Sequence, residues 1–251
     1  MKKLLIIFIL LTNQIHGREI GETEITTEEG IEVYQKEKYY LLKKNVDIKS
    51  DNFNLIAQKV KAFFEKDLYD IVDIHSSGDV KLTSSRGIIA KGEIINFNIK
   101  SENIFIKGKK SYLNNVDFEM LSDESIYVDN LNGKFKLTGL NSKILTEETK
   151  ISGSFIEGTY INIDGENVVQ NLYVEDDTQV NIKTETLNMY SLKGDYEKKT
   201  DTIELFENVK IFRGGELITG DYAKINTVDE SYYVTSDDTK KVKVLLKKTD
   251  E

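Results

Sequence analysis

The stretch ENVKIFRGGELITGDYAKIN, residues 207–226, contains the clearest strand, turn and strand pattern of the chain. Val209 and Ile211 alternate with polar residues, Gly214 and Gly215 supply a turn, and residues 217–225 alternate again. A period of two is typical of a strand buried on one face, and a glycine pair between two such runs is typical of a hairpin. The stretch therefore predicts a half-buried β-hairpin, followed by short strands near residues 232–234 and 242–245.

Weaker copies of this unit occur upstream. The best match places Gly92 on Gly220, and further glycine anchors that precede a polar residue and an aromatic occur at Gly158 and Gly194. A unit repeated along a chain indicates stacked strand pairs, and we expect about five to seven of them. One unit, around residues 118–128, lacks its glycine.

The hairpin sequence resembles the repeat of a known family. The run E-N-V-K-I, a turn and L-I-T-G-D-Y-A-K-I-N is similar to the repeat of the OstA/LptA-like periplasmic lipopolysaccharide-transport proteins. The similarity is close over residues 207–244, looser over 46–106 and faint over 109–188. It implies an all-β fold, an open β-jelly roll built of stacked antiparallel strand pairs, with an apolar groove that holds acyl chains while sugars and phosphates stay in water.

The resemblance also implies partners. In that family, strands pair head to tail at open edges and join protomers or partner domains into a bridge. Such pairing is physically reasonable, because the first and last strands of a stack are unpaired unless they are capped. The candidate edges are residues 32–34 and 242–246. The expected partners are lipopolysaccharide through its lipid A, other transport-bridge proteins and further copies of the chain.

The first 17 residues have the layout of a secretory signal. Lys2 and Lys3 precede an apolar run at residues 4–11, and a polar stretch ends at Gly17. As a helix this run would span about 12 Å, which is short against the ~30 Å core of a bilayer. The cleavage site is poor, so an uncleaved anchor remains an alternative to periplasmic secretion.

The rest of the chain predicts one domain. Residues 18–32 are acidic and form an arm that is either flexible or paired along an edge. No proline and no glycine–serine tract marks a second domain, so residues 33–251 form a single jelly-roll repeat domain. Residues 55–69 also fit one face of a helix, but the internal repeat favours strands there.

Composition leaves little room for catalysis. The chain has no cysteine and two histidines, of which His16 lies in the leader and His75 lies in a predicted polar turn. Paired acids such as Asp176 and Asp177 fall in predicted turns, and adjacent strand residues point to opposite faces. We therefore predict no enzyme, no catalytic residue, no metal site and no cofactor. The net charge of −9, evenly spread, also argues against nucleic acid.

The alternating apolar residues are the candidates for the groove. Burial stabilises a packed core and a bound acyl chain by the same physics, so the pattern alone leaves a closed core open as an alternative. A change of parity between Ile94 and Phe97 predicts a bulge. The groove candidates are Val80, Leu82, Ile88, Phe97, Ile104, Ile203, Leu205, Val209, Ile211, Leu217, Ala223 and Ile225.

Lysine clusters are candidates for contacts with lipid phosphates at the rim of the groove. The alternative is that they keep edges soluble and discourage uncontrolled strand pairing. The candidates are Lys107, Lys109, Lys110, Lys198 and Lys199.

Taken together, these features predict a periplasmic protein that holds lipopolysaccharide acyl chains in an apolar β groove and bridges the inner and outer membranes. A membrane-anchored component of the same transport system, similar to LptC, is one alternative. A structural or surface β-solenoid that binds no lipid is the other.

Overall fold

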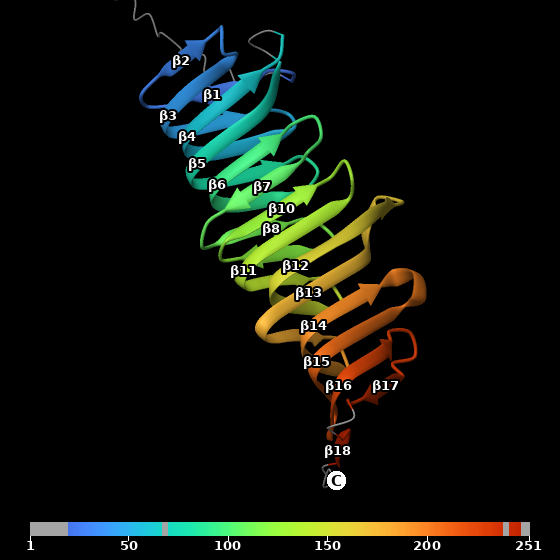
Figure 1. Ribbon diagram of the computed structural model, residues 1–251. Coiled ribbons are helices and arrows are strands. Elements are labelled where there is room, and N and C mark those ends of the chain that lie inside the picture. The colour runs from blue at the N-terminus through green and yellow to red at the C-terminus, as the bar shows by residue number, and fades with distance from the viewer. Residues whose placement is uncertain (1–19, 67–69, 238–240, 247–251) are drawn as a thin grey trace, which may run out of the picture.

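The structure, a computed structural model, describes residues 20–66, 70–237 and 241–246; the predicted leader lies outside them. Within these residues the fold is all-β, as predicted, with 18 strands and one short 3-10 turn, η1 (Lys198–Thr200). The strands pair antiparallel and stack along one elongated body (Figure 1). They are β1 (Glu24–Thr26), β2 (Ile31–Tyr34), β3 (Tyr39–Lys49), β4 (Phe53–Phe64), β5 (Ile71–Ser84), β6 (Ile89–Asn98), β7 (Ile104–Lys107), β8 (Ser111–Asn114), β9 (Glu119–Ser122), β10 (Ser125–Asp129), β11 (Lys134–Leu145), β12 (Lys150–Ile163), β13 (Glu166–Lys183), β14 (Leu187–Glu197), β15 (Thr202–Arg213), β16 (Glu216–Asn226), β17 (Tyr232–Thr235) and β18 (Lys243–Leu246).

The long strands divide into two halves that belong to two walls. β4 pairs with β5 at both ends, but the register shifts between Ile56 and Lys59. In the middle of the chain, two separate short strands take the place of the two halves of one long strand. The first half of β6 pairs with β8, and its second half pairs with β7. We call the wall with β1, β8, β9 and β18 the first wall and the wall with β2, β7, β10 and β17 the second wall. The line of register shifts between them is the closed corner, and the hairpin turns line the opposite side, the opening.

The sequence provides the closed corner in two ways. β3, β5 and β15 carry pairs of residues with positive φ there, for example Glu207 at 66° and Asn208 at 57°. Most of the remaining long strands shift their buried alternation instead, as between Ile218 and Ala223 in β16. Both devices turn a strand while its apolar side chains stay inside, which is how bulges act in curved sheets.

Glycine anchors of the repeat lie at this corner. A Cβ built on Gly92 would lie 2.5 Å from Ile106 Cγ2, and one built on Gly220 would lie 2.6 Å from Val234 Cγ1. Strands at these points are too close for any side chain. The repeated glycine in the sequence therefore marks a repeated close approach between neighbouring strands. Gly158 is an exception, since it faces the Phe135 ring in the second wall.

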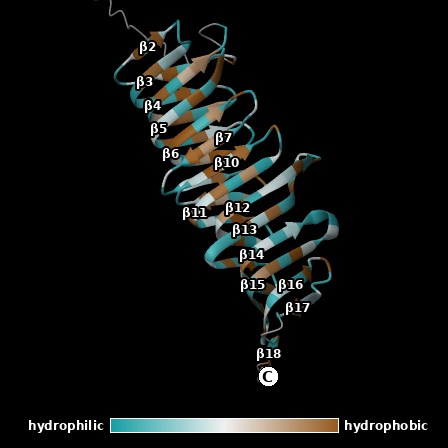
Figure 2. Cartoon of the chain, viewed as in Figure 1, coloured by the Kyte–Doolittle hydropathy of each residue, from teal (hydrophilic) through white to brown (hydrophobic). Residues whose placement is uncertain are grey.

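Most predicted strands are confirmed. Residues 55–64 belong to β4, so the helical alternative is wrong. The apolar runs at residues 104–106, 127–128, 135–137, 160–163, 180–182 and 203–205 all lie in strands. Brown and teal residues alternate along the strands in Figure 2, as the period of two requires.

Three local expectations need correction. The parity change in β6 comes earlier than predicted, because Ala90 and Ile95 are both buried. His75 lies in β5 rather than in a turn. In the acidic arm, residues 24–26 form β1 and pair with β3, which agrees with the edge-pairing alternative, but β2 begins at Ile31, so the strands start before residue 33. Within the described residues, no helix is long and apolar enough to span a membrane.

Candidate functional site

The space between the two walls is one continuous apolar interior. Buried side chains from β3 to β16 form a single cluster, with members from both walls. Its largest members include Leu42, Phe135 and Ile144, each almost fully buried. Burial of this kind stabilises at about 25 cal/mol per Å² of apolar surface. The interior is therefore the hydrophobic core of the protein.

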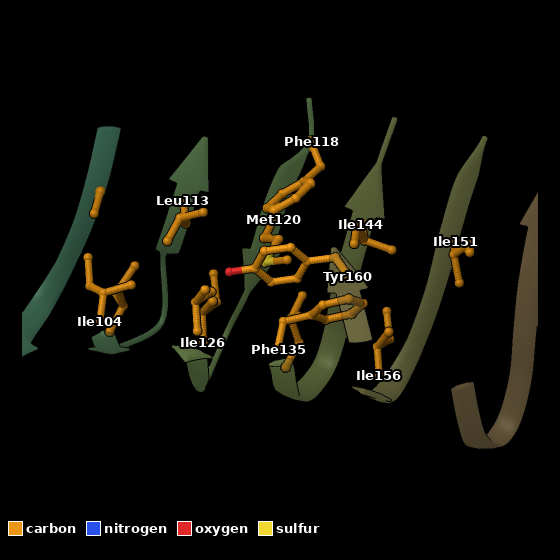
Figure 3. Packing of buried hydrophobic residues seen from close by; sticks show 14 of the residues in the cluster. Ile104, Leu113, Phe118, Met120, Ile126, Phe135, Ile144, Ile151, Ile156 and Tyr160 are labelled. Carbon is orange, nitrogen blue, oxygen red and sulfur yellow. The ribbon is translucent and has the colours of Figure 1, made fainter. Parts of the chain in front are cut away.

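The two walls touch across this interior. Phe53 of the first wall meets Phe97 of the second, with ring centroids 6.0 Å apart. Near mid-length, Phe118 and Tyr160 meet across the walls at 5.9 Å (Figure 3). In this conformation the walls are packed against one another at both places, so an acyl chain has to part them before it can lie there.

Most predicted groove residues face the interior. Leu217 and Ile88 do not fit the expectation: both are only partly buried. In β16 the buried neighbour is Ile218, because the alternation shifts at Gly220 before it reaches Ala223. The prediction that Leu217 points inward is wrong for that reason. The buried candidates are Val80, Leu82, Phe97, Ile104, Ile203, Leu205, Val209, Ile211, Ala223 and Ile225.

The lysine candidates separate into two groups. Lys107, Lys109 and Lys110 lie where β7 leads into β8, at the closed corner, so a role at the rim of the opening does not fit them. Lys198 and Lys199 lie in the turn between β14 and β15, which borders the opening. Lys198 forms an ion pair with Asp201 at 3.0 Å.

Polar side chains cross the opening at several heights. Arg86 Nη1 lies 2.8 Å from Glu102 Oε2, and Arg213 Nη2 lies 3.3 Å from Glu230 Oε2. Exposed pairs of this kind contribute little, about 0–1 kcal/mol each. At these heights the opening is therefore held by weak contacts between side chains, whereas the closed corner is held by the continuous chain.

One cross-opening contact is less exposed. The Tyr232 hydroxyl donates to Glu216 Oε2 at 2.8 Å. Burial, with help from that carboxylate, raises the pKa of Tyr232 above its usual value. The hydroxyl thus stays protonated and remains a donor at neutral pH.

The central residues of the interior were not predicted from the sequence. Phe118, Met120, Phe135 and Tyr160 lie in the region where the repeat is faint. Alternation was visible at residues 134–137, whereas at residues 119–122 the two apolar residues are adjacent. For Phe118 and Met120 the missing signal was the glycine anchor by which the other units could be aligned.

The family of the chain follows from comparison with known proteins. A family model described as LptA/(LptD N-terminal domain) LPS transport protein matches residues 25–231. The chain belongs to this family. The matched residues run from β1 to the turn before β17, so they include almost all of both walls. No curated protein matches the chain.

Among solved structures, LptH, described as the LptA homologous periplasmic component of the lipopolysaccharide transport device from Pseudomonas aeruginosa, is similar to part of the chain. The match covers 52% of this chain and 95% of LptH, with 11% identity and a TM-score of 0.44.

The chemistry available in the interior is that of apolar contact. Among the described residues, no group of three or more His, Asp or Glu side chains is arranged to hold a metal ion. His75 is exposed and lies 2.9 Å from Asp73, outside the interior.

Proposed function

We propose that the chain is a periplasmic carrier that binds lipopolysaccharide by its acyl chains, inside the apolar interior, and passes it between the inner and outer membranes. Membership of the LPS transport family supports the cargo, and the single apolar interior supports the mode of binding. The binding is non-covalent and needs no cofactor. The sugar and phosphate groups of the bound lipid project into water through the opening, which Lys198 and Lys199 border.

The observation that carries this proposal is the difference between the two long sides of the roll. The closed corner is continuous chain, whereas the opening is bridged by exposed side chains. A lipid with apolar tails and a charged head needs such an asymmetry, because its head cannot be buried without a large desolvation cost.

Edge strands at both ends support assembly into a bridge. Among the described residues, β1 and β2 pair only with β3, and β17 and β18 pair only with β16. Val33 and Val244 are both about half exposed on these outer strands. Unpaired strand edges can pair with another chain, so copies or partner domains join head to tail.

Photo-crosslinking at two adjacent residues tests the proposal. A benzophenone amino acid replaces Ile211, which is buried, or Lys210, which is exposed and points away from the interior. With purified lipopolysaccharide, we expect labelling at residue 211 and none at 210. If the folded protein labels at neither position, the interior is a closed core and the structural solenoid is the better interpretation.

The membrane-anchored alternative has a separate test. Mass spectrometry of the mature protein shows whether residues 1–17 are retained. Their removal supports the secreted carrier, and their retention supports the anchored component.

A further inference from the structure

The hairpin of β12 and β13 crosses the opening at the middle of the roll. The register between the two strands shifts at Thr159 and Tyr160, and the hairpin then continues to its turn at residues 164–165. We call residues 160–169 the strap. Its end is tied to the first wall, because the backbone N and the side-chain Nδ2 of Asn167 both donate to Asp117 Oδ2, at 2.9 and 2.7 Å.

The strap inserts one aromatic ring into the interior. Tyr160 is 6% exposed, and its ring lies 5.9 Å from Phe118 and 6.5 Å from Phe135. Figure 3 shows the Tyr160 ring between these two rings and beside Met120. Its hydroxyl donates to Asn130 Oδ1. The ring therefore fills the interior where the two walls meet.

The turn at residues 115–118 and Gly133 both fit closely against the strap. Asn115 Oδ1 accepts hydrogen bonds from the backbone N of Asp117 at 3.0 Å and of Phe118 at 2.8 Å, which fixes the turn that presents both residues. On the other side, a Cβ on Gly133 would lie 2.1 Å from the Tyr160 carbonyl oxygen. Gly133 also has a φ of 59°, which favours glycine.

These contacts make the middle of the roll different from its ends. Elsewhere the opening is bridged by side chains from turns, such as Arg86, which is largely exposed. At the strap, backbone and side chain of one wall bond to the other wall, whereas the Phe53–Phe97 contact joins the walls through side chains alone. An acyl chain that moves along the interior meets this obstruction between the N-terminal and C-terminal parts of the roll.

We propose that the strap is a gate across the apolar interior: lipid occupies the middle only when the Asp117–Asn167 contact is broken and Tyr160 swings out. The inference rests on the proposed function, since it concerns passage of the same cargo. The bulge at Gln170, opposite Thr159 and Tyr160, is the hinge, because the register shift there separates the strap from the rest of the hairpin. The outer side of the strap presents Ile161 and Ile163, each 48% exposed, so no packing holds it from that side.

The chain offers its own reporters for the test. It contains no cysteine, and its internal methionines are Met120 and Met189, both fully buried. Photo-methionine at these positions places one reporter beneath the strap and one on β14. The paired variant Asp117→Cys/Asn167→Cys, oxidised with copper phenanthroline, locks the strap, and reduction with dithiothreitol releases it. Each single cysteine variant is a matched control, and Tyr160→Ala removes the ring.

With purified lipopolysaccharide, we expect labelling of Met189 in every variant. Labelling of Met120 should fall about tenfold in the oxidised pair relative to the reduced pair and the single variants, as expected when one state excludes the ligand. Tyr160→Ala should label Met120 at least as strongly as the reduced pair.

The inference is overturned if Met120 is labelled equally in the oxidised and reduced pair while Met189 is labelled. It is also overturned if Met120 stays unlabelled in Tyr160→Ala while Met189 is labelled, or if the disulfide does not form. If neither methionine is labelled in any variant, the proposed lipid binding itself fails, and the gate fails with it.

Discussion

Gly220 lies directly against Val234 of the next strand, so close that a Cβ on Gly220 would lie 2.6 Å from Val234 Cγ1 and 2.6 Å from the Thr235 carbonyl oxygen. The glycine in the hairpin that indicated the fold is thus required for the approach of β17 to β16. The same relationship holds between Gly92 and Ile106 on β6 and β7.

Replacement of this glycine should destabilise the roll. Gly220→Val forces the neighbouring strand to move, and overpacking of this kind costs about 1–3 kcal/mol. Urea unfolding measures the change in the free energy of unfolding. Thr219→Val is the matched control, since it adds the same side chain one residue away on a partly exposed position, and we expect it to change stability by less than about 0.5 kcal/mol. Equal stability of Gly220→Val and wild type would show that the corner tolerates a side chain.

Loss of the strap contact should loosen residues 160–169 specifically. Asp117→Ala removes the acceptor of both Asn167 donors, and hydrogen bonds to a charged group contribute about 1.5–3 kcal/mol. We expect amide exchange in the strap to rise by about tenfold or more while exchange in β4 and β5 stays unchanged. Asp164→Asn, in the turn of the same hairpin, is the control: asparagine tolerates the φ of 54° at this position, so exchange at residues 166–169 should stay near the wild-type rate. Uniform acceleration over the whole chain would instead indicate global destabilisation.

The sequence predicted the architecture because the same pattern of alternating strands and glycines recurs along the chain. Alternation gave the strands, and the glycines of residues 92 and 220 gave the repeat. What it did not give was the direction of each side chain across a bend. Leu217 and Ala223 share odd numbers, but the shift at Gly220 places Ile218 inside. A bend that inserts an odd number of residues reverses the inward or outward direction assigned to every later side chain. The alternation on either side of the bend does not reveal the insertion.

The strap was beyond prediction for a different reason. Asp117 and Asn167 are 50 residues apart, and their contact depends on the stacking of several strands between them. Tyr160 itself was visible as an aromatic in an alternating run, next to a glycine anchor. The sequence could place it in a strand but not across the opening.

Tyr160 should also make stability depend on pH in the alkaline range. Burial, with smaller contributions from the Asp129 and Glu102 carboxylates, raises the pKa of Tyr160 to about 12. In the unfolded chain tyrosine titrates near pH 10. Between about pH 10 and 12 the hydroxyl is therefore ionised in the unfolded chain but still protonated in the folded protein, so the free energy of unfolding falls as the pH rises. We expect wild type to lose about 1–2 kcal/mol more than Tyr160→Phe between about pH 9 and 11.5, measured by urea unfolding. The Phe variant keeps the ring and cannot ionise, so equal losses in both proteins would show that Tyr160 titrates normally.

The two ends of the roll should assemble head to tail through different strands. If assembly uses the edges, proline at Val33 in β2 or at Val244 in β18 removes a donor from one end only. Each variant alone should be monomeric at concentrations where wild type associates. A mixture of the two should form dimers and nothing larger, because only one intact end of each kind is available. Sedimentation velocity separates these species, and circular dichroism checks that both variants remain folded. Dimers formed by either variant alone would point to a symmetric contact in place of head-to-tail pairing.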